Sequence, residues 1–314
     1  MILMPASKKN TATESVHVKP FLKWAGGKRQ LLAHFNDLYP VELKTGTIKN
    51  YYEPFLGSAA VFFDIAQRYR IENAFLFDVN LELILTYQVI QSHVSKLAEV
   101  LLKHEKKYLA LNKQQRLVYF YDQREQFNQQ RFDTGFTKSN SKGIARAAQL
   151  IFLNRTCYNG LFRVNSKGEF NTPAGDYAKP SICDFKNLAA VSKLLENATI
   201  RQADFAKALQ NTAVSSFVYL DPPYRPLSRT ANFTSYSKSI FQDEQQSKLA
   251  SLYRKLDKKG AVLMLSNSDS PDNFFDKLYK GFTITRVPAR RQINADASKR
   301  GLVNEIVVTN YPLV

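Results

Sequence analysis

The sequence contains few cysteines and no long apolar segment. Cys157 and Cys183 are the two cysteines in 314 residues, too few for a disulfide framework or a metal cluster, and they fit a reduced, cytoplasmic setting. No apolar run is long enough to span a bilayer. The apolar start of the chain precedes its lysines, the reverse of a secretory signal. We therefore interpret residues 1–18 as a mobile N-terminal tail.

Acidic residues are also scarce relative to basic ones. The chain has 44 Lys and Arg against 27 Asp and Glu, a formal net charge of +17. Such a field favours a polyanionic partner, chiefly nucleic acid or an anionic membrane surface. Composition alone is equally compatible with a merely soluble basic protein.

Short runs rich in β-branched and aromatic residues recur along the chain, and no internal repeat is present. Their continuous apolar character is typical of strands buried on both faces. A helical pattern over 243–259 lies between two of them, and this alternation predicts an α/β sheet. The predicted strands lie within 73–78, 214–221, 260–268, 281–287 and 304–310.

The middle of the chain interrupts this pattern. Residues 94–146 are polar and mostly helical in pattern, and 154–180 are dense in Asn, Gly and Pro, which indicates turns and a hairpin. We therefore expect residues 91–195 to form an inserted domain. Residues 19–90 and 196–314 then form the sheet domain.

A short apolar strand at Tyr51 turns through Gly57-Ser58-Ala59 into an apolar helix, and the next predicted strand ends on Asp78. A small-residue turn lets a ligand approach the backbone and meet a helix N-terminus. A carboxylate about twenty residues later is the usual partner of a ribose hydroxyl. The alternative is an ordinary strand–turn–helix corner.

The stretch from Lys23 to Arg29 places Trp24, two glycines and three cations together. Lys28 is suited to hold a carboxylate, and Trp24 to lie against an aliphatic or cationic ligand. Alternatively, Trp24 is a core anchor and the glycines form a plain turn.

The predicted strand at 214–221 ends in Asp221-Pro222-Pro223-Tyr224, which cannot continue a strand ladder. Ligands of open α/β sheets bind at the carboxyl ends of strands. There, Asp221 and an adjacent carbonyl can accept both hydrogens of an exocyclic amine, and Tyr224 offers a face to a planar ring. The alternative is a turn with a capping aspartate.

These segments together resemble the Dam-type, D12-class DNA adenine-N6 methyltransferases, from about Lys19 to the C-terminus and in the family's order. The matching stretches are "FLKWAGGK", "YYEPFLGSAAVFF", "FDVN", "NRTCYNGLFRVNSKGEFNTPAG" and "LDPPY". The resemblance implies a class I methyltransferase-like (Rossmann-like) α/β sheet and an inserted, mostly helical target-recognition domain with a β-hairpin. It also implies S-adenosyl-L-methionine as methyl donor. The implied cofactor-binding residues are Trp24, Ala25, Gly26, Lys28, Phe55, Gly57, Asp78, Asp204, Phe205 and Asp221.

The catalytic residues implied by the resemblance are Asp221, Pro222, Pro223 and Tyr224. A base stacked in a duplex cannot reach a cofactor buried at the strand ends, so we expect the target adenine to flip out. Its amine then attacks the sulfonium methyl group, helped mainly by positioning. One departure from the family is Ala59, which stands where a second glycine is common; we expect a slightly tighter turn with binding retained.

The insert most resembles family members that methylate adenine in GATC, which implies that Lys23 and Arg163 read guanines. Arg163 can fork onto guanine O6 and N7, and Tyr158, beside Asn159, can wedge into the gap left by a flipped base. Without the resemblance, a hairpin with a solvated Arg163 is the simpler interpretation. We also expect Leu161 and Pro173 to contact thymine methyl groups. Near the C-terminus, the expected phosphate contacts are Arg290, Arg291, Lys299 and Arg300. The alternative for that loop is that it is merely solvated.

The expected protein is a monomeric adenine-specific DNA methyltransferase of the prokaryotic cytoplasm, with double-stranded DNA as partner and no metal site. A restriction endonuclease is a possible functional partner. The alternatives are an RNA adenine methyltransferase and a non-catalytic DNA-binding protein. The predicted hairpin disfavours the RNA enzyme, because the major groove of A-form RNA is too narrow for it. A nicotinamide dehydrogenase is a further alternative at the level of the fold.

Overall fold

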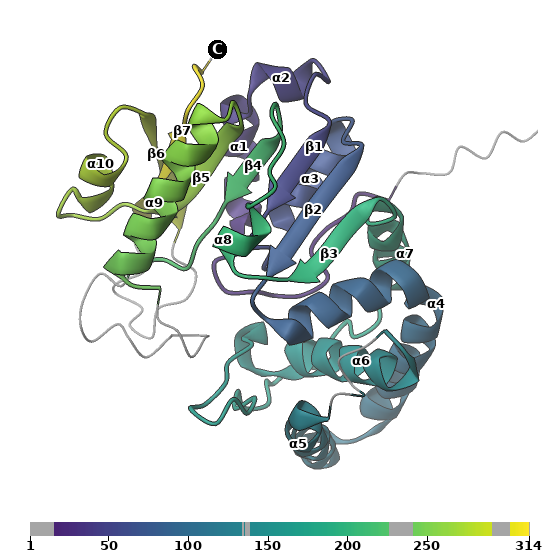
Figure 1. Cartoon of the computed structure of the whole chain (residues 1–314). Helices are drawn as coiled ribbons and strands as arrows, with labels where there is room; N and C mark the ends of the chain where they lie inside the picture. The colour runs from purple at the N-terminus through teal and green to yellow at the C-terminus, as the bar shows by residue number, and fades with distance from the viewer. Residues whose placement is uncertain (1–15, 134, 136–138, 226–240, 291–301, 314) are drawn as a thin grey trace, which may run out of the picture.

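The computed structural model describes residues 16–133, 135, 139–225, 241–290 and 302–313 (Figure 1). Most of the predicted N-terminal tail, residues 1–15, lies outside the described residues. Among the described residues, no helix is both long and apolar enough to cross a bilayer.

The described residues form a seven-stranded sheet in the order β3-β2-β1-β4-β5-β7-β6. The first five strands in this order run parallel, and β7 pairs antiparallel with both β5 and β6. This arrangement confirms the predicted class I methyltransferase-like α/β sheet. The strands are β1 (Asn50–Glu53), β2 (Asn73–Asp78), β3 (Ala198–Gln202), β4 (Phe217–Leu220), β5 (Val262–Ser268), β6 (Thr283–Arg290) and β7 (Leu302–Thr309).

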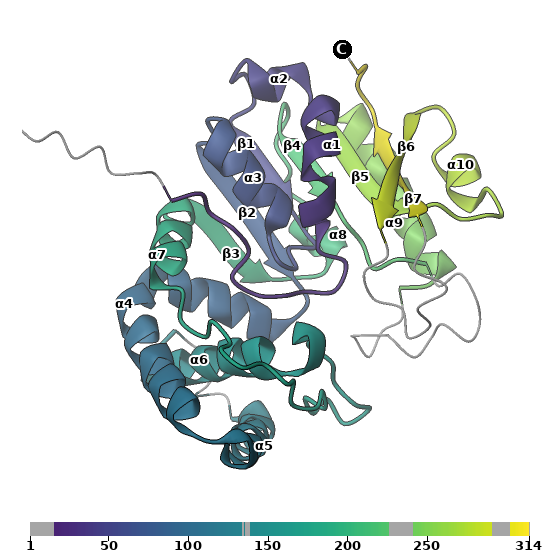
Figure 2. The ribbon, with the colours of Figure 1, turned by 180° about the vertical axis from the view of Figure 1, so that it is seen from behind.

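Helices cover both faces of the sheet, as Figures 1 and 2 show from opposite sides. One face carries α1 (Leu32–Leu38) and α3 (Ala60–Arg68), and the other carries α8 (Phe205–Ala208) and α9 (Asp243–Lys258). Side chains of β4 alternate between the two cores, because successive strand residues point to opposite faces. The remaining short helices of this part are η1 (Lys28–Leu31), α2 (Val41–Lys44) and α10 (Phe274–Leu278).

Six strands and α9 lie where the apolar and helical patterns predict them, whereas β3 has no such pattern. Its residues ATIRQ bury only Ile200 fully and leave Arg201 and Gln202 exposed, since β3 is an edge strand of the sheet. An edge strand has one neighbour to pack against and tolerates polar side chains. Pairing with β2 defines β3 as a strand.

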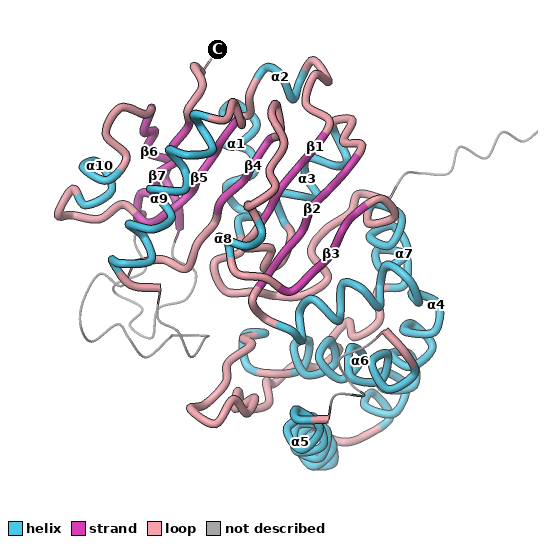
Figure 3. The backbone as a smooth tube through the Cα atoms, viewed as in Figure 1, coloured by secondary structure: helices cyan, strands magenta, loops and turns pink. Residues whose placement is uncertain are grey.

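The middle of the chain is helical, as predicted, and Figure 3 shows its helices grouped beside the sheet. The longest, α4, has non-helical backbone angles at His93, so the expected domain boundary at residue 90 falls inside α4 just before this kink. An antiparallel bridge between Val164 and Phe170 closes a hairpin-like turn. The helices are α4 (Leu81–Ala110), α5 (Lys113–Gln129), η2 (Gln130–Phe132), α6 (Ser141–Thr156), η4 (Tyr158–Gly160) and α7 (Phe185–Leu194).

The helical insert lies at the carboxyl ends of β2 and β3. Helix α4 starts three residues after β2 ends and packs along α6 and α7, and its buried leucines join the core that covers one face of the sheet. In Figure 1 the insert therefore lies directly below the ends of β2 and β3. Any ligand bound at the strand ends lies close to this insert.

Candidate active site

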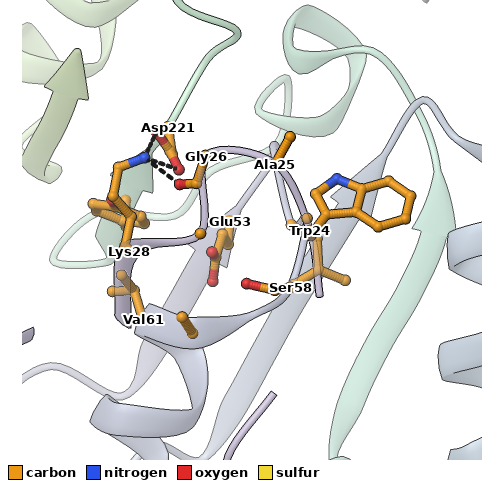
Figure 4. A pocket seen from close by; sticks show the side chains of 13 residues that line it. Trp24, Ala25, Gly26, Lys28, Glu53, Ser58, Val61 and Asp221 are labelled. Atoms are coloured by element: carbon orange, nitrogen blue, oxygen red, sulfur yellow. Dashed lines mark hydrogen bonds and ion pairs between the residues drawn. The ribbon is translucent and has the colours of Figure 1, made fainter. Parts of the chain in front are cut away.

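A pocket lies at the carboxyl ends of β1 and β4 (Figure 4). The stretch from Trp24 to Lys28 forms one wall, and Leu56–Ser58 with the start of α3 forms another. Glu53 and Asp221 supply carboxylates at the ends of their strands. The pocket thus gathers six of the predicted cofactor-binding residues: Trp24, Ala25, Gly26, Lys28, Gly57 and Asp221.

Lys28 and Asp221 form a nearly buried ion pair in this pocket. The Lys28 ammonium lies 2.7 Å from each oxygen of the Asp221 carboxylate and also donates to the Gly26 carbonyl at 2.7 Å. Its side chain is only 4% exposed, against 19% for Asp221. The structure therefore places Lys28 against a carboxylate of the protein itself, and the pair holds Asp221 in one orientation at the end of β4.

A second contact fixes the other side of Asp221. The Ser266 hydroxyl on β5 donates to Asp221 Oδ1 at 3.2 Å, and it lies 2.8 Å from the hydroxyl of Tyr219. Burial raises the pKa of Asp221, and the Lys28 ammonium and the Ser266 hydrogen bond oppose that rise. Burial likewise raises the pKa of Glu53, whose carboxylate accepts a hydrogen bond from Tyr51.

The ring of Tyr224 is fixed at its hydroxyl and over one face. Its hydroxyl donates to Glu305 on β7, a carboxylate whose pKa is raised by burial. The Lys28 ammonium lies over the ring, 4.7 Å from its centroid. Nearby, the buried Gln246 amide on α9 donates to the Pro223 carbonyl at 3.2 Å. The contacts at its hydroxyl and over one face therefore hold the Tyr224 ring in one orientation.

Asp78 lies at the end of β2 and binds backbone. Its two carboxylate oxygens accept from the amides of Gly57 at 3.0 Å and Asn80 at 2.8 Å. Gly57 has φ +48°, and a Cβ there would come 3.2 Å from the Trp24 ring. Ala59, the departure from the family, also has left-handed backbone with φ 55°, a conformation that costs a residue with a side chain about 1–2 kcal/mol.

Three phenylalanines cluster at the ends of β1 and β3. The rings of Phe55 and Phe205 stack at 5.7 Å, and Phe241 meets both edge-on at 5.7 Å. Asp204 accepts from the amides of Ala206 and Lys207, which caps the N-terminus of α8. The structure thus brings Phe55 and Phe205 together and gives Asp204 a local capping contact.

The predicted recognition residues lie beside the pocket. Trp24 stacks on Phe162 with ring centroids 5.2 Å apart, so the turn of the insert touches the wall of the pocket. Tyr158 is 57% exposed, and its amide donates to the Pro173 carbonyl at 2.9 Å. Asn159 is exposed with φ 54°, which orients this tight turn.

The two predicted guanine-reading side chains contact neighbouring residues of the insert. The exposed Arg163 guanidinium donates through Nε to the Asn171 side chain at 2.8 Å and through Nη2 to the Asn171 carbonyl at 3.5 Å. The Lys23 ammonium lies 4.9 Å from the centroid of the Tyr177 ring. Leu161, the other predicted base contact of this turn, is partly buried.

The predicted phosphate contacts near the C-terminus are only partly described. Arg290 is the last residue of β6, where its backbone pairs with Leu302 of β7. Arg291, Lys299 and Arg300 lie outside the described residues.

Sequence reasoning missed four polar residues of the site: Glu53, Gln246, Ser266 and Glu305. A glutamate at the end of the apolar stretch NYYE was a local signal for Glu53. The contacts of the other three join residues 23 to 81 positions apart, which no local pattern connects.

Comparison with known proteins gives full-length matches. A family model described as D12 class N6 adenine-specific DNA methyltransferase matches residues 24–293. The Type II methyltransferase M.MjaIII of Methanocaldococcus jannaschii is 48% identical over 297 residues, covering 94% of this chain and 100% of that protein. The Type II methyltransferase M1.LlaDCHI of Lactococcus lactis subsp. cremoris is 38% identical over 298 residues (94% and 96%). The DNA adenine methylase of Escherichia coli strain K12 is 31% identical over 295 residues (94% and 96%).

Proposed function

Because the chain belongs to the D12 class of N6 adenine-specific DNA methyltransferases, we propose that it methylates an adenine flipped out of duplex DNA, within the sequence GATC. The methyl donor proposed is S-adenosyl-L-methionine. Membership of this family argues against the nicotinamide dehydrogenase alternative. That alternative rested on a shared α/β sheet, which by itself does not specify the ligand. The observation that supports the proposal most is the contact between Trp24 of the pocket and Phe162 of the exposed turn.

The chemistry of the pocket fits S-adenosyl-L-methionine. Its walls combine an ammonium, two carboxylates and the indole of Trp24, which suit a ligand with a charged amino-acid end and an apolar middle. Trp24, Ala25, Gly26, Gly57 and Asp78 would hold the ligand, with Phe55, Asp204 and Phe205 at its adenine end. The bound donor supplies an electrophilic methyl group.

Asp221 and Tyr224 would hold the target base. The Asp221 carboxylate and the Pro222 carbonyl accept the two hydrogens of the adenine amine, which frees the nitrogen lone pair from the ring. The face of the Tyr224 ring away from Lys28 stacks on the base, and Glu305 keeps that ring from turning. Since Lys28 and Ser266 already fix Asp221, the acceptor needs no rearrangement when the base arrives.

The exposed turn would read the DNA. Lys23 and Arg163 are assigned to guanines, Leu161 and Pro173 to thymine methyl groups, and Tyr158 to the space left by the flipped base. The exposure of Tyr158 and Arg163 on one short turn supports this assignment. We also propose phosphate contacts for Arg290, Arg291, Lys299 and Arg300, and residues 91–195 as the recognition domain.

We further propose that the enzyme acts as a monomer in the cytoplasm and has a restriction endonuclease as functional partner. The names of two relatives, each a Type II methyltransferase, support the pairing. Sedimentation of the protein with and without a duplex containing one target site tests the monomer. Survival of cells that express a GATC-cutting endonuclease, with and without this protein, tests protection.

The target sequence is tested by incubating unmethylated plasmid with the protein and S-adenosyl-L-methionine. We expect the plasmid to become resistant to an endonuclease that N6-methyladenine in GATC blocks. Methyl incorporation into plasmid that stays fully cleavable would reject GATC and keep the enzyme class. Tritium transfer to RNA of the same sequence is the matched substrate control, and a rise in 2-aminopurine fluorescence at the target position on binding tests base flipping.

A further inference from the structure

Side-chain amides fix the backbone of the segment that leads into the pocket. The Gln67 amide on α3 accepts from the Val18 amide at 2.6 Å and donates to the Val18 carbonyl at 3.1 Å. The Asn187 amide on α7 pairs with Lys19 in the same manner, at 3.0 and 2.9 Å. Each side chain thus replaces the pair of hydrogen bonds that a neighbouring strand would provide.

Asn154 on α6 makes a third such pairing with Lys23. It accepts from the Lys23 amide at 2.9 Å and donates to the Lys23 carbonyl at 2.8 Å. Unlike Asn187, it makes a further bond to the recognition turn, donating to the Gly160 carbonyl at 2.8 Å. Asn154 is 1% exposed, so water cannot substitute for these bonds.

The Lys23 side chain runs across Gly160. A Cβ at Gly160 would lie 2.3 Å from Lys23 Cδ and 2.7 Å from Lys23 Cβ, so only glycine leaves room for the lysine stem. Beyond it, the ammonium lies over the Tyr177 ring. The direction of Lys23 therefore depends on the position of its backbone relative to Gly160, and Asn154 bonds to both.

We propose that Asn154 is a positioning residue for base recognition, which sets Lys23 in register with the turn at Tyr158–Gly160. This inference rests on the proposed function, in which Lys23 contacts a guanine. Asn154 touches no base itself. Its loss should affect discrimination at the base pair that Lys23 reads and spare the one assigned to Arg163.

The experiment compares Asn154→Ala with Asn187→Ala, a matched control that removes the same type of buried backbone pairing from Lys19. Methylation kcat/KM is measured on hemimethylated duplexes, in which one strand alone offers an unmethylated adenine. That strand carries GATC, or GATC with either its first or its last base pair replaced, so that the two replaced positions are distinct. We expect Lys23→Ala and Asn154→Ala to lose discrimination at the same single position, each by about fivefold or more. Asn187→Ala should keep discrimination at both positions. The double variant Lys23→Ala/Asn154→Ala should lose no more than Lys23→Ala alone.

Urea unfolding of each variant separates recognition from stability. If Asn154→Ala does not fold, Gly160→Ala decides, because it displaces Lys23 while the Asn154 amide stays; it should lose discrimination at the Lys23 position. The inference alone would be overturned if Lys23→Ala loses discrimination and the folded Asn154→Ala protein keeps it. Where Gly160→Ala decides, full discrimination in that variant has the same meaning. An equal loss of discrimination with Asn187→Ala would also overturn the inference. Full discrimination with Lys23→Ala would overturn the assigned role of Lys23 and the inference with it.

Discussion

Two neighbouring regions of the molecule are organised in opposite ways. In the catalytic corner, which we define as Lys28, Asp221, Tyr224 and Glu305, the charged and hydroxyl groups bind one another and are largely buried. In the recognition turn, residues 158–163, the backbone is fixed and the side chains of Tyr158 and Arg163 are exposed, with Arg163 bound to Asn171 alone among the described residues. The two regions meet where Trp24 stacks on Phe162.

Under the proposed function, the difference follows from what each region would bind. Methyl transfer needs acceptors held within a fraction of an ångström, so partners within the protein fix the catalytic groups beforehand. Base edges in a groove are read by donors that must project outward, so these side chains have to stay exposed in the free protein. The predictions below test this contrast.

The largest effect is expected for Asp221→Ala, which removes the central acceptor of the catalytic corner. Methyl transfer should fall by at least about 10²-fold because the amine loses its positioning partner, whereas DNA affinity should change little. Steady-state turnover and equilibrium DNA binding measure the two quantities separately. Asp269→Ala, which removes a carboxylate paired with Arg286 just after β5, is the control. Near-normal turnover of the Asp221 variant would reject the catalytic assignment.

Arg163→Ala should show the complementary behaviour of the recognition turn. We expect a loss of about 1–3 kcal/mol of discrimination at one guanine, because the guanidinium can donate two parallel bonds to that base. Rates on matched and single-substituted duplexes give the discrimination. Lys167→Ala, an exposed cation at the tip of the same hairpin, should weaken binding to all sequences alike. An equal loss of rate on every duplex with Arg163→Ala would assign that arginine to the DNA backbone.

A smaller effect is expected on the pH dependence of the catalytic corner. Asp221 must be ionised to accept the amine, and burial raises its pKa above 3.8, so turnover should fall on the acid side at a pH above that value. The Ser266 hydrogen bond lowers the pKa of Asp221, and Ser266→Ala should therefore move the acid limb of kcat to higher pH. The control is Ser268→Ala, on the same strand, because the Ser268 hydroxyl has no hydrogen-bond partner among the described residues. An acid limb that stays in place or moves to lower pH would contradict the assignment to Asp221.

The smallest effect is expected for Ala59→Gly, next to the pocket. Relief of left-handed strain gains about 1–2 kcal/mol, and this is offset by the loss of a buried methyl worth about 0.8 kcal/mol and by a more flexible unfolded chain worth about 0.4–1 kcal/mol. The free energy of unfolding in urea should therefore change by less than about 1 kcal/mol. Ala60→Gly, at the first residue of α3, should be clearly destabilising. Equal destabilisation by both would show that residue 59 stores no strain.

Much of the α/β sheet follows from local sequence. The apolar runs that form β2, β4, β5 and β7 are continuous because those strands, at least in part, are covered on both faces, so each run predicts its own strand. The tetrapeptide at Asp221 was predictable as a site because two prolines cannot continue the β4 ladder. The edge strand β3 was not predictable, since its polar sequence needs β2 beside it.

The sequence by itself determined the chemical groups of this protein: a carboxylate, two prolines and a tyrosine after a buried strand, a glycine-rich basic stretch, and a turn with an arginine. Only the tertiary structure decided how they pair. Lys28 meets Asp221 across 193 positions and Glu305 meets Tyr224 across 81. Asn154 meets Lys23 across 131. Such contacts depend on the order of the strands and the packing of the insert, because hydrogen bonds act over a few ångströms in space, whatever the separation along the chain.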